Sequence, residues 1–125
     1  MDGDILFFFQ QDPAVLPLYE TLEARIQAEL GPVQCKVQKT QISFYKKHLF
    51  GCVSFLRVKK KKELPEHYLT LTFGLDHPAE SPRIAVVTEP YPRRWTHHLV
   101  LSRPEQIDGE LMDWLKEAAE YAVRK

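Results

Sequence analysis

Residues that could bind or transform a ligand gather in one short stretch, Tyr91–His98, which holds two arginines, a tryptophan and two histidines. A guanidinium pairs with carboxylate or phosphate through two parallel hydrogen bonds, and an indole ring offers a flat surface for stacking. An imidazole exchanges protons near neutral pH. These residue types point either to an anion site or to a general acid–base centre.

The anion-binding hypothesis draws on side chains from three separate stretches of the chain. We predict that one concave patch of a folded sheet collects their cationic, amide and aromatic groups, which belong to Lys39, Gln41, Arg83, Arg94, Trp95, His97 and His98. A small anionic ligand or an acidic segment of a protein partner would fit such a patch. The alternative is that Trp95 anchors the core and the arginines face solvent, with their stems over apolar surface. No glycine-rich phosphate loop strengthens the case for a nucleotide.

A run of lysines from Lys59 through Lys60 and Lys61 to Lys62 predicts a second kind of surface. Four adjacent ammonium groups could follow a nucleic-acid backbone, helped by Lys46, Lys47 and Arg57. Such a run is more often a solvated loop, or a device that keeps an edge strand from pairing with another chain. Because 17 Lys and Arg balance 17 Asp and Glu, no overall field draws the molecule to nucleic acid. We therefore rank nucleic-acid binding below ligand binding.

An enzyme that uses His97 or His98 as general acid or base is a third hypothesis. No cysteine or serine lies in a sequence context that would activate it as a nucleophile, and no pair of catalytic carboxylates is evident. Adjacent strand residues point to opposite faces of a sheet, so the two imidazoles cannot reach one metal ion without distortion. The sequence thus favours a binding module over an enzyme and assigns no catalytic residue, no metal ligand and no cofactor.

Length and composition place these residues on a single domain over residues 1–125. With 44% apolar and 27% charged residues, the chain can bury a core of its own. Cys35 and Cys52 are the only cysteines, and such a pair makes neither a zinc knuckle nor a disulfide framework. Reduced thiols fit a cytoplasmic protein.

The N-terminal apolar run Ile5–Phe9 is too short, and wrongly flanked, for a signal peptide. No stretch approaches the length of a membrane span, so we expect no membrane contact. If the run Phe7–Phe9 were exposed it would mark a protein-binding surface, whereas such runs usually pack beneath a sheet.

Hydrophobic periodicity predicts a helix near each end of the chain. The segment from Asp12 to Leu30 begins with an N-cap residue and a proline, and its apolar residues then recur every three or four positions. Its regular part starts near Leu16, because Pro17 lacks a backbone donor. Asp108 caps a second helix, whose apolar stripe continues to Ala122.

Between the helices, apolar and polar residues alternate as in half-buried strands. The stretches with this alternation are 33–37, 42–44, 50–58, 67–73 and 95–101. Residues 84–87 fit a short strand or one helical turn equally well. In the last strand, Trp95, His97, Leu99 and Leu101 share one face. The sum is an α+β domain in which an antiparallel sheet of about five strands packs both terminal helices on one face.

Three stretches of the chain, Lys39–Phe44, Ser81–Ile84 and Trp95–His98, resemble a known family. This is the bacterial family catalogued as domain of unknown function 5655, and the similarity extends over about residues 13–121. The resemblance implies a small cytoplasmic α+β protein of unassigned activity. It also implies that these three stretches matter to the family, and it supplies no mechanism.

Overall fold

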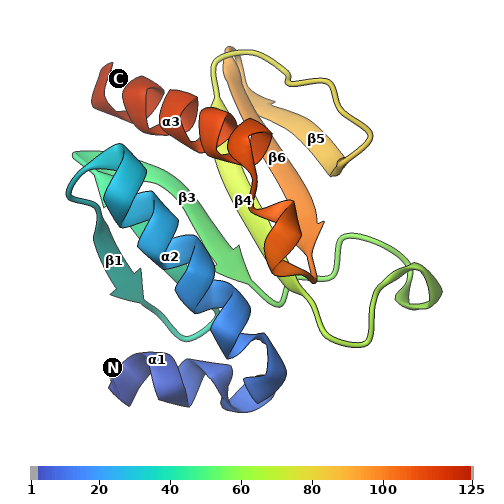
Figure 1. Cartoon of the computed structure of the whole chain (residues 1–125). Coiled ribbons are helices and arrows are strands. Elements are labelled where there is room, and N and C mark those ends of the chain that lie inside the picture. The colour runs from blue at the N-terminus through green and yellow to red at the C-terminus, as the bar shows by residue number, and fades with distance from the viewer. Residues whose placement is uncertain (1–2, 125) are drawn as a thin grey trace.

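The computed structural model describes residues 3–124, in which three α-helices accompany six strands (Figure 1). The helices are α1 (Gly3–Phe8), α2 (Leu16–Leu30) and α3 (Gly109–Arg124). The strands are β1 (Gln34–Val37), β2 (Gln41–Lys46), β3 (His48–Ser54), β4 (Leu69–Leu75), β5 (Ile84–Tyr91) and β6 (Arg94–Leu101). Short 3-10 turns are η1 (Phe9–Gln11), η2 (Pro13–Val15), η3 (Lys61–Glu63) and η4 (Pro104–Gln106).

The strands form one antiparallel sheet in the order β1-β2-β3-β4-β6-β5. The predicted α+β class is confirmed, with six strands in place of about five. The added strand is β5, at the edge outside β6. Its period is hard to recognise because most of β5 is exposed and its pairing with β6 is irregular between Ile84 and Val86 and again between Thr88 and Tyr91.

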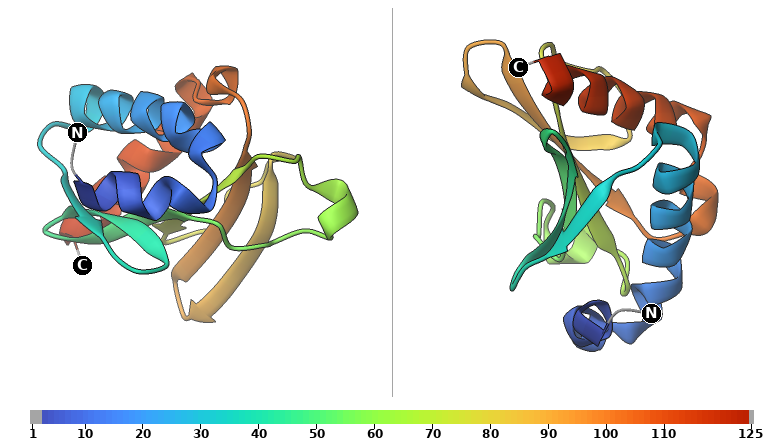
Figure 2. Two further views of the ribbon diagram at one scale, coloured as in Figure 1. Left: turned by 90° about the horizontal axis from the view of Figure 1, so that it is seen from below. Right: turned by 90° about the vertical axis from the view of Figure 1, so that its left-hand side faces the viewer.

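Helices α2 and α3 cover the same face of the sheet, as predicted (Figure 1, Figure 2). The strand side chains on that face are buried against them, and the core is built mainly from Phe44, Val53, Leu71, Phe73, Leu99, Leu22, Ile26, Leu111 and Leu115. Within residues 3–124 no helix covers the opposite face, which carries a row of small polar side chains. The alternation along each strand therefore separates a packed face from an open one.

Helix α2 begins as the sequence indicates. The carboxylate of Asp12 accepts a hydrogen bond from the backbone N–H of Ala14 at 3.3 Å, and Pro13 opens a 3-10 turn ahead of the helix. The regular helix starts at Leu16, so Pro17 sits in its first turn, where no backbone donor is needed. Gly31 ends the helix with a φ of 77°, a conformation that favours glycine.

Helix α3 begins at its predicted cap, since Asp108 Oδ1 accepts the N–H of Leu111 at 3.1 Å. Its apolar stripe is buried on the sheet, from Leu111 to Ala122. None of the helices in the described part of the chain is long and apolar enough to cross a bilayer.

Helix α1 was not expected from the sequence, because six residues are too few to show a helical period. The aromatic run that it carries divides between two environments. Phe8 and Phe9 are 3% and 1% exposed, whereas Phe7 is 73% exposed. The expectation of a packed run thus holds for two of the three rings, and the third remains on the surface.

Candidate functional site

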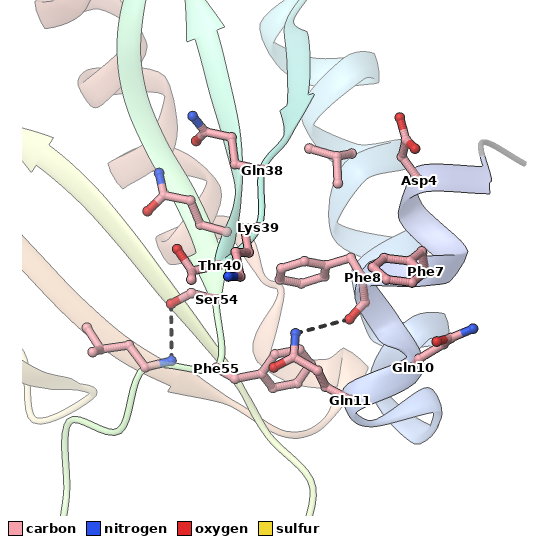
Figure 3. Close-up of a pocket in the computed structure, with 13 residues that line it drawn as sticks. Asp4, Phe7, Phe8, Gln10, Gln11, Gln38, Lys39, Thr40, Ser54 and Phe55 are labelled. Carbon is pink, nitrogen blue, oxygen red and sulfur yellow. Dashed lines mark hydrogen bonds between the residues drawn. The ribbon is translucent and has the colours of Figure 1, made fainter.

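An open groove lies between the N-terminal helical segment and the hairpin that joins β1 to β2 (Figure 3). Its volume is about 930 Å³, which suits a small-molecule ligand. Residues of α1 and η1 form one wall, and residues 37–41 of the hairpin form the other. The end of β3 and the two residues after it, Phe55 and Leu56, complete the lining.

The apolar part of the groove is aromatic. The rings of Phe8 and Phe55 stack with their centroids 5.5 Å apart and their planes 26° apart. Phe7 stands at the edge of the groove with most of its ring exposed, and Leu56, which also lines the groove, is exposed as well. A flat apolar group would therefore find ring faces to contact.

The polar part of the groove is a hairpin held by its own side chains. The Gln38 N–H donates to the Gln41 carbonyl at 2.8 Å, which closes the turn. The Gln41 amide donates to the Ser43 hydroxyl at 2.7 Å, and that hydroxyl donates to Gln38 Oε1, also at 2.7 Å. This network fixes the turn that presents Lys39 and Thr40 to the groove.

Among residues 3–124, Lys39 is the one cation that lines the groove. Its ammonium makes no hydrogen bond or ion pair with any residue between positions 3 and 124. Asp4, the carboxylate of the lining, belongs to the opposite wall (Figure 3). The hairpin side of the groove is thus positively charged and open to an anion.

The predicted convergence of cationic side chains on one patch is wrong. Lys39 and Gln41 meet in the groove beside β1 and β2, whereas Arg83 precedes β5 and Arg94 begins β6, at the other edge of the sheet. Four strand intervals separate β2 from β5, which is roughly 19 Å. A single small ligand cannot contact both sets of residues.

Arg83 makes structural contacts in place of the predicted ligand contacts. Its guanidinium donates to Asp108 Oδ1 at 2.9 Å, to Glu110 Oε1 at 3.0 Å and to the Gln106 carbonyl at 2.5 Å. It also lies 5.8 Å from the ring centroid of Trp114. The hydrogen bond from Arg83 holds the pKa of Asp108 below its ordinary value. Arg83 therefore attaches the start of β5 to the start of α3.

His97 and Trp95 lie on the helix-covered face, as their alternation with Leu99 predicts. The His97 ring is fully buried and stacks on Phe73, with centroids 4.8 Å apart and planes 3° apart. Its Nε2 accepts the N–H of Ala79 at 2.9 Å. Burial is the main cause that lowers its pKa. His97 is therefore a neutral residue packed in the core. Trp95, which lies opposite Leu75 of β4, is half-buried.

His98 lies on the open face, and its Nδ1 shares a hydrogen bond of 2.8 Å with the Thr72 hydroxyl. Cys52 is the next residue in this cross-strand row. An imidazole beside a hydroxyl has the components of a base and a nucleophile. Within residues 3–124, however, no side chain or backbone group bonds to Nε2 of His98 to orient the ring. The pair alone does not make a catalytic centre.

His98 should contribute a loss of stability as the pH drops below about 6.5. Burial lowers the pKa of His98 in the folded protein, so the unfolded chain takes up a proton at a higher pH than the fold does. The stability lost through this group reaches at most about 1.4 kcal/mol per pH unit. His98→Asn can still bond to Thr72 but cannot titrate, so we expect a shallower decline of Tm between pH 7 and pH 5.

The matched control for this pH profile is His48→Asn, an exposed position of the same sheet. Its Tm should follow the wild-type curve. If His98→Asn leaves the pH dependence unchanged, protonation of His98 does not limit the fold.

Lys59–Lys62 belong to the long connection between β3 and β4, which extends away from the helices (Figure 1). All four lysines are exposed. Lys46 and Lys47 lie at the far end of the seven-residue strand β3, and Lys46 donates to the Leu30 carbonyl. The structure therefore does not gather these cations into one basic surface.

The structure also shows one group of possible metal ligands that the sequence did not predict. Asp76 and His77, which follow β4, lie beside Glu117 of α3, and one ligand atom from each is within 4.8 Å of the others. Forty residues separate His77 from Glu117, so no local spacing reveals the group. The adjacent acid and histidine in a loop were the only signal available.

Comparison with known proteins identifies a family without an assigned activity. The family described as Domain of unknown function (DUF5655) has a model that matches residues 7–122 of the 125-residue chain. The chain belongs to this family, as its three resembling stretches predict. No curated protein matches the chain, and no solved structure does.

Proposed function

We propose that this member of a family without a described activity is a non-enzymatic binding module, whose groove takes a small anionic ligand with a flat apolar body. The proposal is carried by one observation. The Lys39 ammonium, which has no partner in the described part of the chain, shares a groove with the stacked rings of Phe8 and Phe55.

The cationic, aromatic and amide groups of the groove would each contact a different part of such a ligand. A carboxylate or sulfonate would pair with the Lys39 ammonium and displace only water from it. A planar apolar body would pack on the aromatic wall. The amides of Gln10 and Gln11 on one wall and of Gln38 on the other can each donate and accept hydrogen bonds, so they would orient polar substituents.

Calorimetry with 2-naphthoate tests the proposal, because this probe combines a flat apolar body with a carboxylate. The neutral 2-naphthalenemethanol is its matched comparison. We expect the acid to bind more tightly than the alcohol. Lys39→Met should weaken binding of the acid about tenfold, which corresponds to about 1.4 kcal/mol, and should leave the alcohol unchanged.

Lys60→Met is the control variant, since it removes the same charge from the distant β3–β4 connection. It should bind 2-naphthoate as the wild type does. Equal affinities for acid and alcohol, or equal losses in the two variants, would show that no anion site exists at Lys39. Absence of binding by either probe at millimolar concentration would contradict the groove as a small-ligand site.

We further propose that the protein works in the cytoplasm. Its two cysteines support this placement, because Cys35 and Cys52 are free thiols on different strands. Burial raises the pKa of Cys35 to about 11. It would therefore persist as an unreactive thiol.

A further inference from the structure

Asp76, His77 and Glu117 bring three metal-ligand atoms together where the β4–β5 loop meets α3. The carboxylate oxygens and an imidazole nitrogen all lie within 4.8 Å of one another. The three side chains are at the surface, so water and ions reach them. This cluster is separate from the groove, so a role for it is independent of the proposed function.

The His77 ring is oriented by the backbone of the next residue. Its Nδ1 lies 3.3 Å from the Pro78 carbonyl, which can only accept a hydrogen bond, so Nδ1 carries the hydrogen. Nε2 makes a hydrogen bond with the Glu117 carboxylate, which accepts it, so a metal ion would replace the hydrogen on Nε2. Metal-bound histidines commonly donate their second N–H to a carbonyl in this way, which fixes the ring and the tautomer.

The other ring nitrogen of His77, Nε2, lies near two carboxylates. It is 4.0 Å from Asp76 Oδ1 and makes a close contact with Glu117 Oε2. One imidazole nitrogen and two carboxylate oxygens therefore meet at one point of the surface. Arg124 is 3.9 Å from the other oxygen of Asp76, Oδ2, and so lies outside this meeting point. A metal cation at this point would be attracted by both carboxylates and would take the place of the hydrogen between His77 and Glu117.

Both elements that carry the three side chains are attached to the core. The loop is fixed at Ala79, whose N–H donates to the buried Nε2 of His97 at 2.9 Å. Glu117 projects from a helix that is packed on the sheet along its length. Ligands on fixed backbone need only side-chain rotation to close around an ion.

We propose that Asp76, His77 and Glu117 bind a zinc ion and thereby join the β4–β5 loop to α3. One imidazole with two carboxylates is a donor set that zinc accepts, with water in the remaining position. Magnesium and calcium prefer oxygen donors throughout, so the imidazole selects against them. With zinc bonds of about 2.0–2.2 Å, Asp76 would move closer to His77, and the close contact between His77 and Glu117 would open to admit the ion.

Calorimetric titration of the full chain with zinc chloride tests this site. We expect one zinc per chain, with affinity reduced at least tenfold in His77→Ala and in Glu117→Gln. Magnesium chloride should give no binding at the same concentrations. His67→Ala is the matched control, because His67 is also exposed and also contacts two carboxylates, those of Asp12 and Glu66. It should bind zinc as the wild type does.

Cobalt(II) provides a spectroscopic check that does not depend on folding of the variants. Its absorption spectrum should lack the near-ultraviolet charge-transfer band of a cobalt–thiolate bond, since no cysteine belongs to the cluster. The proposal would be overturned by a thiolate band in the cobalt spectrum. It would also be overturned if His67→Ala lost as much zinc affinity as His77→Ala, or if the wild type bound no zinc up to millimolar concentration.

Discussion

Replacing Phe73 with alanine is expected to lower the free energy of unfolding by about 3–5 kcal/mol. Phe73 is 1% exposed and lies between two aromatic neighbours. His97 stacks on it at 4.8 Å and Trp114 at 5.8 Å, so one ring joins β6, β4 and α3. Removing it leaves a cavity and two unsupported rings. Urea denaturation followed by circular dichroism measures the loss.

Phe7→Ala is the matched control, since it removes the same ring from a position that is 73% exposed. Its free energy of unfolding should stay within about 0.5 kcal/mol of the wild type. Equal losses in the two variants would mean that the aromatic stack does not determine the stability of the sheet–helix contact.

Arg83→Leu is expected to lower the free energy of unfolding by about 1–2 kcal/mol. The change leaves Asp108 and Glu110 as neighbouring carboxylates without their shared cation and leaves the Gln106 carbonyl without its donor. Solvent screening at these half-exposed carboxylates keeps the loss below that of a buried pair. The helix cap at Asp108 should loosen, which hydrogen exchange in the first turn of α3 would detect.

Arg94→Leu separates this structural role from a general effect of losing an arginine. Arg94 is exposed at the start of β6 and makes no ion pair with the residues described. Its stability should remain that of the wild type. Neither variant should change the affinity for 2-naphthoate, since both arginines lie far from the groove. If Arg83→Leu were as stable as Arg94→Leu, the contacts of Arg83 with α3 would be incidental.

Local patterns predicted most of the fold. The caps at Asp12 and Asp108 and the period of the long helices are properties of short segments, and both helices begin where these signals place them. The alternation in β4 and β6 correctly placed His97 with the core. Helix α1 and strand β5 were harder, because one is too short for a period and the other is exposed along most of its length.

The candidate site was predictable only where it is local. Lys39 and Gln41 share the groove because one tight hairpin carries both. Their expected meeting with Arg83 failed because strand order places β2 and β5 far apart, and no pattern in a single sequence specifies that order. The sequence did not reveal the groove wall formed by α1, because six residues are too few to show a helical period. The cluster of Asp76, His77 and Glu117 was not predictable either, because it forms where the loop after β4 meets α3.

The position of β6 between β4 and β5 has a consequence for how the chain is assembled. During synthesis β4 emerges before β5 and β6. The edge of β4 that later pairs with β6 stays open when β5 emerges, because β5 pairs with β6 and not with β4. The last two strands are close in sequence and can form a hairpin before they join the rest. Until that hairpin docks, the nascent protein carries an unprotected strand edge, so the interval between β4 and β6 is when it is most exposed to aggregation.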